Sequence, residues 1–394
     1  MHPADEHAGR RIADLRKING MTQTGLSQAT SFSASLIAQV ETGKKPASAA
    51  FVAACARAFH VDISVISGQP YQAELRADHL EQLVDPIREG LDWYDIGPAD
   101  PQLQPRATSV LAAIADDMCA KVRAGQLRTV AELLPSVMQE ATAAAYSEGT
   151  SDAWGVLGTV YRNAYDVSTK LGYQDLAAIS LDRMDWAGQR ASDPVLSALR
   201  QYMRSLVHLR TGKYTMGGRL IEAGQRILEQ APEGTERTAM SGQLHLGSAV
   251  IAARSGDRDT AIAHLDQAHL AAARTGEVPK LRWVSFGPTN VSAHRVAVFS
   301  ELRDYNGAVE TADDMSIPAD WPASRSGRHF VEVATAQLWT GRNDASFKSL
   351  LKARKVAPQQ TRYDFTVRET VAALVRAQRS TPDTLSNMAQ WVGI

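Results

Sequence analysis

A turn pattern that recurs every 38 to 47 residues is the feature that most limits what this chain can fold into. In each copy a glycine ends an apolar-periodic stretch, a helix-capping residue follows three positions later, and a small residue follows five positions later. Glycine suits the left-handed backbone position after a helix, and Ser, Thr, Asp and Asn accept the free amide hydrogens of the next helix. The copies are Gly172, Asp175 and Ala177; Gly212, Thr215 and Gly217; Gly256, Asp259 and Ala261; Gly341, Asp344 and Ser346; and, without the glycine, Arg303, Asn306 and Ala308.

This pattern predicts a series of helical hairpins whose two helices approach closely at the small residue. A single hairpin cannot bury its apolar face, so neighbouring hairpins are expected to stack into a superhelix. An irregular helical bundle is the alternative. One segment also has the spacing of the first helix of a tetratricopeptide repeat, through Trp154, Leu157, Gly158 and Tyr161.

The whole chain is predicted to be all-α. Apolar residues recur three and four positions apart almost everywhere, and no run shows the period of two that a strand requires. Five short helices fit residues 8–67, and a more polar helix fits residues 73–92. Gly125 marks an earlier, degenerate copy of the hairpin turn, and residues 361–391 form a terminal pair of helices.

A proline-rich break divides the chain. The stretch WYDIGPADPQLQPRA contains Gly97, Pro98, Pro101 and Pro105, and clusters of this kind are typical of loops. We therefore predict three parts: a five-helix domain at 1–70, a linker helix with the break at 71–105, and a superhelical array of tetratricopeptide-like hairpins at 106–394.

The stretch MTQTGLSQATSFSASLIAQVETGKKP has the layout of a helix, a turn and a second helix. Ser33 is a capping candidate for a helix that runs from Ala34 to about Thr42. Ile37 and Val40 face the core of the domain. The opposite side carries a stripe of small and polar residues, Ala34, Ser35, Ala38 and Gln39, and Gly43, Lys44 and Lys45 follow the helix.

Residues 8–67 resemble the helix-turn-helix of phage repressors and the wider XRE family. The resemblance runs in order through GRRIADLRK, MTQTGLSQA, SASLIAQVETGKKP and FVAACARAFHVDISVI. It implies binding to double-stranded DNA, with Gln23, Ser33 and Lys44 on phosphates, Ser35 and Gln39 at base edges, and Arg16 and Glu41 as an intramolecular ion pair. Ser31 departs from the family, which usually has glycine at this point of the turn, where a left-handed backbone strains serine. Either the turn is distorted, or the core carries a cost of about 1 kcal/mol.

The residues themselves indicate limited direct reading of bases. Gln39 can pair with adenine, which is worth roughly 1–3 kcal/mol against a wrong base, whereas Ala34 and Ala38 reach only thymine methyl groups. Lys45 adds a second cation beside Lys44. We expect specificity to depend on dimer geometry and DNA shape. A helix-turn-helix used only for protein contacts is the alternative.

Charge supports the same assignment. The chain has a formal net charge of −1, so there is no overall attraction to nucleic acid. Within the first domain, however, cations outnumber anions: Arg10, Arg11, Arg16, Lys17, Lys44, Lys45 and Arg57 against Asp5, Glu6, Asp14, Glu41 and Asp62.

The segment LRWVSFGPTNVSAHR at 281–295 is the least repeat-like part of the array. Aromatic walls with a few convergent polar groups are what a small-ligand site requires. The effector candidates here are Arg282, Trp283, Phe286, Asn290 and His294, and further candidates on first helices are Arg162, Tyr165, Tyr202 and His245. The alternative is a structural plug where the hairpin lengthens.

Residues 106–394 resemble the helical-repeat half of actinobacterial XRE-type regulators, through DLAAISLDR, RWVSFGPTNVSAHR and WVGI. The wider resemblance is to peptide-responsive regulators with tetratricopeptide-like repeats. It implies a homodimer whose repeats bind a peptide or small-molecule effector that alters operator binding. A protein-interaction scaffold or antitoxin-like partner with secondary DNA binding is the alternative.

Sequence signals for an enzyme are poor. The GKK at 43–45 lacks the upstream glycine of a phosphate-binding loop, no Gly-x-Ser-x-Gly is present, and the histidines show no metal-ligand spacing. We expect no catalytic site, no cofactor and no metal. Cys55 and Cys119 lack paired spacing and are expected to be reduced core thiols of a cytoplasmic protein without a membrane span.

Overall fold

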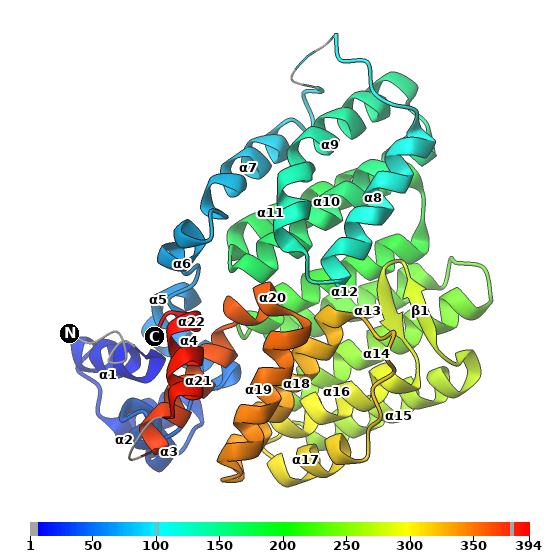
Figure 1. Ribbon diagram of the computed structural model, residues 1–394. Coiled ribbons are helices and arrows are strands. Elements are labelled where there is room, and N and C mark those ends of the chain that lie inside the picture. The colour runs from blue at the N-terminus through cyan, green and yellow to red at the C-terminus, as the bar shows by residue number, and fades with distance from the viewer. Residues whose placement is uncertain (1–6, 99, 101, 379–381) are drawn as a thin grey trace.

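The computed structural model describes residues 7–98, 100, 102–378 and 382–394 (Figure 1). Most of the described chain is helical, which confirms the all-α prediction. One short antiparallel hairpin, formed by β1 (Val278–Leu281) and β2 (Val284–Phe286), was not expected. Strand propensity was hard to recognise there because β1 spans only four residues and contains Pro279.

The N-terminal domain, here called the head, is a compact group of five helices, as predicted. Its core is formed by apolar residues from all five helices, including Ile12, Leu26, Ile37, Phe51 and Ile66. The helices are α1 (Ala8–Ile18), α2 (Gln23–Thr30), α3 (Ala34–Glu41), α4 (Ala49–Phe59) and α5 (Ile63–Ser67).

The segment after the head is divided where one helix was predicted. It contains α6 (Gln72–Ala77), a 3₁₀ turn at Glu81–Leu83, and α7 (Val84–Asp92). His79 between them has a φ of 55°, which no helix continues through. The proline-rich break follows α7, although Pro101 lies outside the described residues.

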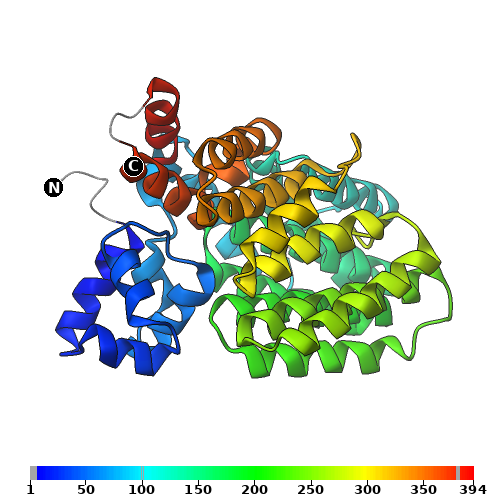
Figure 2. The same cartoon turned by 90° about the horizontal axis from the view of Figure 1, so that it is seen from below.

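The remaining described chain forms a helical array of stacked hairpins (Figures 1 and 2). Most hairpins have a first and a second helix that contact each other along their length. The helices are α8 (Thr108–Arg123), α9 (Leu127–Glu148), α10 (Ser151–Leu171), α11 (Gln174–Ala191), α12 (Pro194–Arg210), α13 (Tyr214–Leu228), α14 (Thr235–Ser255), α15 (Arg258–Thr275), α16 (Pro288–Glu301), α17 (Tyr305–Asp313), α18 (Ala323–Trp339), α19 (Asn343–Val356), α20 (Pro358–Arg362), α21 (Phe365–Ala377) and α22 (Asp383–Val392).

The predicted turns are confirmed at their first and third positions. The four glycines have positive φ, from 71° at Gly212 to 92° at Gly172, and Arg303 takes the same conformation with a φ of 61°. The small residues are buried where the two helices meet: Ala177, Gly217, Ala261, Ala308 and Ser346.

The capping prediction was wrong. Asp175, Thr215, Asp259, Asn306 and Asp344 lie inside the first turn of their helices rather than at the capping position. The left-handed residue redirects the chain so sharply that the next helix begins two residues later. The aspartates still interact favourably with the positive end of the helix dipole.

The first helix of one hairpin contacts the first helix of the next: α12 contacts α14, α14 contacts α16, and α16 contacts α18. We call the surface formed by the first helices α8, α10, α12, α14, α16 and α18 the inner face. The array curls until its ends meet, because α8 contacts α18 and Gln359 Oε1 accepts the amide hydrogen of Leu127 at 2.7 Å. Side chains that are far apart in the sequence therefore face one another across the inner face.

Candidate functional site

The head presents a complete helix-turn-helix in α2 and α3. The Thr22 hydroxyl accepts from the Gly25 amide at 3.0 Å, and the Ser33 hydroxyl accepts from the Leu36 amide at 3.2 Å, so both helices are capped. The turn between them contains Ser31 at φ 61°, the left-handed conformation that the sequence predicted there. Serine carries a strain of about 1 kcal/mol in this conformation, which the packed core tolerates.

The predicted base-reading stripe lies on the side of α3 away from the head core. Ser35 is exposed, and Ala34, Ala38 and Gln39 are half-buried. Gln39 Nε2 donates to Ser35 Oγ at 3.2 Å, which holds the amide along the helix surface. Lys44, just after the helix, is exposed and is able to meet a phosphate.

Arg16, Glu41 and Gln23 form a network that fixes α1, α2 and α3 together. Arg16 Nε lies 2.6 Å from Glu41 Oε1, and Gln23 Nε2 donates to Glu41 Oε2 at 2.8 Å. Burial raises the pKa of Glu41, but the hydrogen bonds from Arg16 and Gln23 outweigh burial, so the pKa is lowered overall. Gln23, predicted at a phosphate, thus has one amide hydrogen engaged inside the head.

Lys45, also predicted at DNA, instead contacts the repeat array. Its Nζ donates to the Trp339 carbonyl oxygen at 3.4 Å and lies 4.8 Å from the centroid of the Trp339 ring. The array therefore binds one of the lysines that the sequence assigned to DNA.

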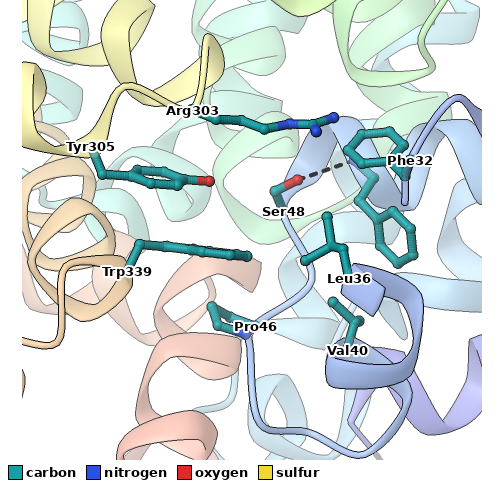
Figure 3. Close-up of a pocket in the computed structure, with 9 residues that line it drawn as sticks. Phe32, Leu36, Val40, Pro46, Ser48, Arg303, Tyr305 and Trp339 are labelled. Atoms are coloured by element: carbon teal, nitrogen blue, oxygen red, sulfur yellow. Dashed lines mark hydrogen bonds between the residues drawn. The ribbon is translucent and has the colours of Figure 1, made fainter. Parts of the chain in front are cut away.

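A small pocket of about 40 Å³ lies at this contact between the head and the array (Figure 3). From the array, the Tyr305 and Trp339 rings stack with centroids 4.9 Å apart. The Arg303 guanidinium lies 4.2 Å from the centroid of Phe32. The remaining lining residues belong to the head: Leu36, Val40, Pro46, Ser48 and Phe51. One side of α3 thus faces the array while its predicted base-reading stripe does not.

Helix α21 makes a second contact with the head. Glu369 is buried, and its carboxylate accepts the amide hydrogens of Ala8 at 3.0 Å and Ala47 at 3.4 Å. Arg376 Nε donates to the Gly43 carbonyl oxygen at 2.9 Å. The loop that follows α3 is therefore held by α18 on one side and α21 on the other.

The β1–β2 hairpin uses several effector candidates in contacts within the protein. Arg162 donates to the carbonyl oxygens of Arg282 and Trp283, and Trp283 Nε1 donates to Asp116 at 2.6 Å. Phe286 is fully buried. These contacts favour the structural alternative for this part of the segment.

A second group of effector candidates meets on the inner face. Asn290 Nδ2 donates to Gln243 Oε1 at 3.2 Å, and His294 Nδ1 lies 2.8 Å from the Asn290 carbonyl oxygen. Burial and the positive charge of Arg325 lower the pKa of His294 to about 3, so its ring is neutral. Tyr202 and Tyr165 are buried close by on α12 and α10.

His245 is separated from this group. It lies between α14 and α15, where its Nδ1 is 2.9 Å from Nδ1 of His264. Burial lowers the pKa of both imidazoles, which is consistent with a neutral pair that shares one hydrogen.

Sequence reasoning did not identify Arg325, Arg303, Tyr305 or Trp339 as candidates. A signal for Arg325 was available, because the SRSGRHF stretch places two arginines among small residues at a helix start. For the other three the positions relative to the head depend on how the array curves, which no local pattern shows.

Comparison with known proteins supports the head assignment. The sequence model of the helix-turn-helix domain family HTH_31 matches residues 7–65, which supports a DNA-binding regulator. No curated protein matches the chain. Among solved structures, the crystal structure of BtubC (BKLC) from P. vanneervenii is similar, with a TM-score of 0.35 and 14% identity over 64% of this chain and 92% of that chain. A similarity at this level carries no argument about function.

Proposed function

We propose that this chain is an XRE-type transcriptional regulator that binds double-stranded DNA as a homodimer. The observation that carries the proposal is the stripe Ala34, Ser35, Ala38 and Gln39, which α3 turns away from both the head core and the array. So small a stripe reads few bases. Two heads on half-sites about one helical turn apart would supply the missing specificity.

Salt dependence of DNA binding tests this proposal. Arg10, Lys17 and Lys44 are exposed in each head, so a dimer offers about six phosphate contacts and a slope near −5 in log affinity against log salt concentration. A monomer with three such contacts gives a slope near −3. The measurement is fluorescence anisotropy on a labelled duplex. A slope near zero would instead indicate a protein-interaction scaffold.

We further propose that the tetratricopeptide-like array receives a peptide or small-molecule effector and has no catalytic step, and that the protein acts in the cytoplasm. An effector changes DNA binding only if it prefers one of two head arrangements. The contacts of Lys45 with Trp339 and of Gly43 with Arg376 provide one arrangement, in which the head is docked. The other is a released head in which Lys45 is free to meet a phosphate.

Replacing Trp339 by alanine removes the ring whose centroid lies 4.8 Å from Lys45 Nζ and leaves the main-chain carbonyl oxygen in place. We expect this loosening of Lys45 to strengthen DNA binding. One more phosphate contact in each head would steepen the salt slope of a dimer from about −5 to about −7. The measurement is the same anisotropy titration at several salt concentrations. In a Lys45→Ala background the Trp339→Ala change should leave the slope as it was. Equal affinity and slope in wild type and Trp339→Ala would show that docking does not limit DNA binding.

Among the described residues, no helix is both long and apolar enough to cross a bilayer.

A further inference from the structure

Three cations from different helices lie on the inner face without forming an ion pair: Lys170 of α10, Arg210 of α12 and Arg325 of α18. Among the described residues, none of the three is joined to a carboxylate. All three residues are half-buried, although Nε of Arg325 and Nη1 of Arg210 are themselves buried. Side chains of this kind are seldom left unpaired inside a protein.

Arg325 is the centre of this group. One of its terminal nitrogens, Nη2, donates to Asn290 Oδ1 and lies 3.4 Å from His294 Nδ1. Its Nε is buried without any hydrogen-bond acceptor. The hydrogen-bond partners of the guanidinium are thus neutral, and its Nε has none.

Other buried polar atoms around Arg325 also lack a hydrogen-bond partner. Nη1 of Arg210 and Nδ1 of His329 are buried and have no hydrogen-bond partner, and His329 is only 4% exposed. Burial and the charge of Arg325 lower the pKa of His329 to about 4, which places the two side chains near each other. Buried polar atoms without a partner are rare and call for an explanation such as a bound ion or ligand.

Nearby carboxylates compensate the positive charge of the group only in part, because each also interacts with another arginine. Asp166 lies 3.7 Å from Arg162, and Glu332 and Asp364 lie 2.7 Å and 3.5 Å from Arg328.

Lys170 shows the effect of this positive excess. Burial lowers its pKa, and the charges of Arg210, Arg325 and Arg328 lower it further against the opposing effect of Asp166. The four cations therefore lie close enough to repel one another. A bound anion would relieve that repulsion.

We propose that the inner face binds the carboxylate or phosphate group of a small ligand, held by Arg325 and flanked by Lys170 and Arg210. A guanidinium fork matches the paired oxygens of both groups, and a lysine adds a point charge. This inference rests on the proposed effector role of the array, and it specifies that the effector carries a negative charge. Tyr202, Asn290 and His294, predicted from the sequence, form the neutral wall beside the anion.

The test is thermal unfolding of the full chain, without DNA, in increasing inorganic phosphate or succinate at constant ionic strength, with chloride as reference. A ligand that binds the folded state raises Tm with its concentration. We expect such a rise for wild type. Arg325→Gln should weaken the binding of the anion about tenfold or more, since it removes charge-assisted hydrogen bonds.

Arg219→Gln is the matched control, because Arg219 is exposed on α13 and the substitution changes the net charge equally. Arg210→Gln serves as the second variant if Arg325→Gln does not fold. A rise with phosphate alone indicates a phosphorylated ligand, and a rise with succinate alone indicates a carboxylate ligand. No rise above chloride, or the same loss in Arg219→Gln as in Arg325→Gln, would overturn the proposal. The absence of DNA keeps this result separate from the salt-slope test.

Discussion

Replacing Glu41 by alanine is expected to lower the free energy of unfolding of the head by about 3–5 kcal/mol, because it leaves a buried guanidinium without its counter-charge. The side chains of Arg16 and Glu41 are only 12% and 6% exposed, so water replaces the lost partner poorly. Gln23 loses its acceptor at the same time. A loss of this size approaches the whole stability of a small domain.

The two cysteines allow the head and the array to be measured separately. Cys55 is buried in the head core and Cys119 in the array. Alkylation of each thiol, followed by mass spectrometry, reports local opening. In Glu41→Ala the labelling of Cys55 should accelerate by about a hundredfold to a few thousandfold, with Cys119 unchanged.

Asp14→Ala is the control within the same domain. Its partner Arg10 is 60% exposed, and such exposed pairs contribute only about 0–1 kcal/mol. Arg16→Met combined with Glu41→Leu should recover most of the stability, because it removes both charges. Equal protection of Cys55 in Glu41→Ala and Asp14→Ala would contradict the assigned role of the ion pair.

The same pair predicts how the head responds to acid. The pKa of Glu41 is lowered in the folded head, so its contribution to stability is present above the pKa of the unfolded chain. That contribution is lost as the pH falls through the lower folded value.

Replacing Phe286 by alanine is expected to destabilise the array by about 3–5 kcal/mol, as truncation of a buried aromatic ring does. Phe286 is fully buried, and its ring lies directly against Gly242 of α14, where a β-carbon would come within 2.1 Å of Cζ. Only a glycine leaves room for the ring. The measurement is the free energy of unfolding in denaturant, together with alkylation of Cys119.

The close fit suggests a matched double variant. Gly242→Ala alone should be destabilising because its methyl group collides with the ring. In the Phe286→Ala background the same change should recover stability, because the methyl group enters the vacated space. Leu270→Ala, which alters a side chain 56% exposed, should cost little. If Gly242→Ala has the same effect on stability in both backgrounds, the Phe286 ring does not pack against Gly242 as described.

Local features of the fold were predictable because their causes are local. A left-handed residue ends a helix whatever lies around it, and even Arg303 adopts that conformation. The solvent-facing stripe on α3 followed from the spacing of Ile37 and Val40. The capping prediction failed at Asp175 because the exact first residue of a helix depends on the geometry of the turn before it.

The contacts between the head and the array could not be predicted in this way. Lys45 and Trp339 are 294 residues apart, and their meeting depends on small rotations summed over every hairpin between them. The position of Arg325 beside Asn290 depends on the same curvature. Sequence patterns identified Asn290 and His294 as candidates but not the guanidinium that gives their surroundings a charge.

Helix α18 carries Arg325 near its first residue and Trp339 at its last, about 21 Å apart at 1.5 Å per residue. A continuous helix behaves as a stiff rod, so a tilt at one end displaces the other. Thermodynamic reciprocity then applies: whatever factor the anion imposes on DNA affinity, DNA must impose on anion affinity. If the inner face binds an anion and DNA binding is coupled to it, as proposed, DNA-bound and free molecules would respond to different concentrations of that anion.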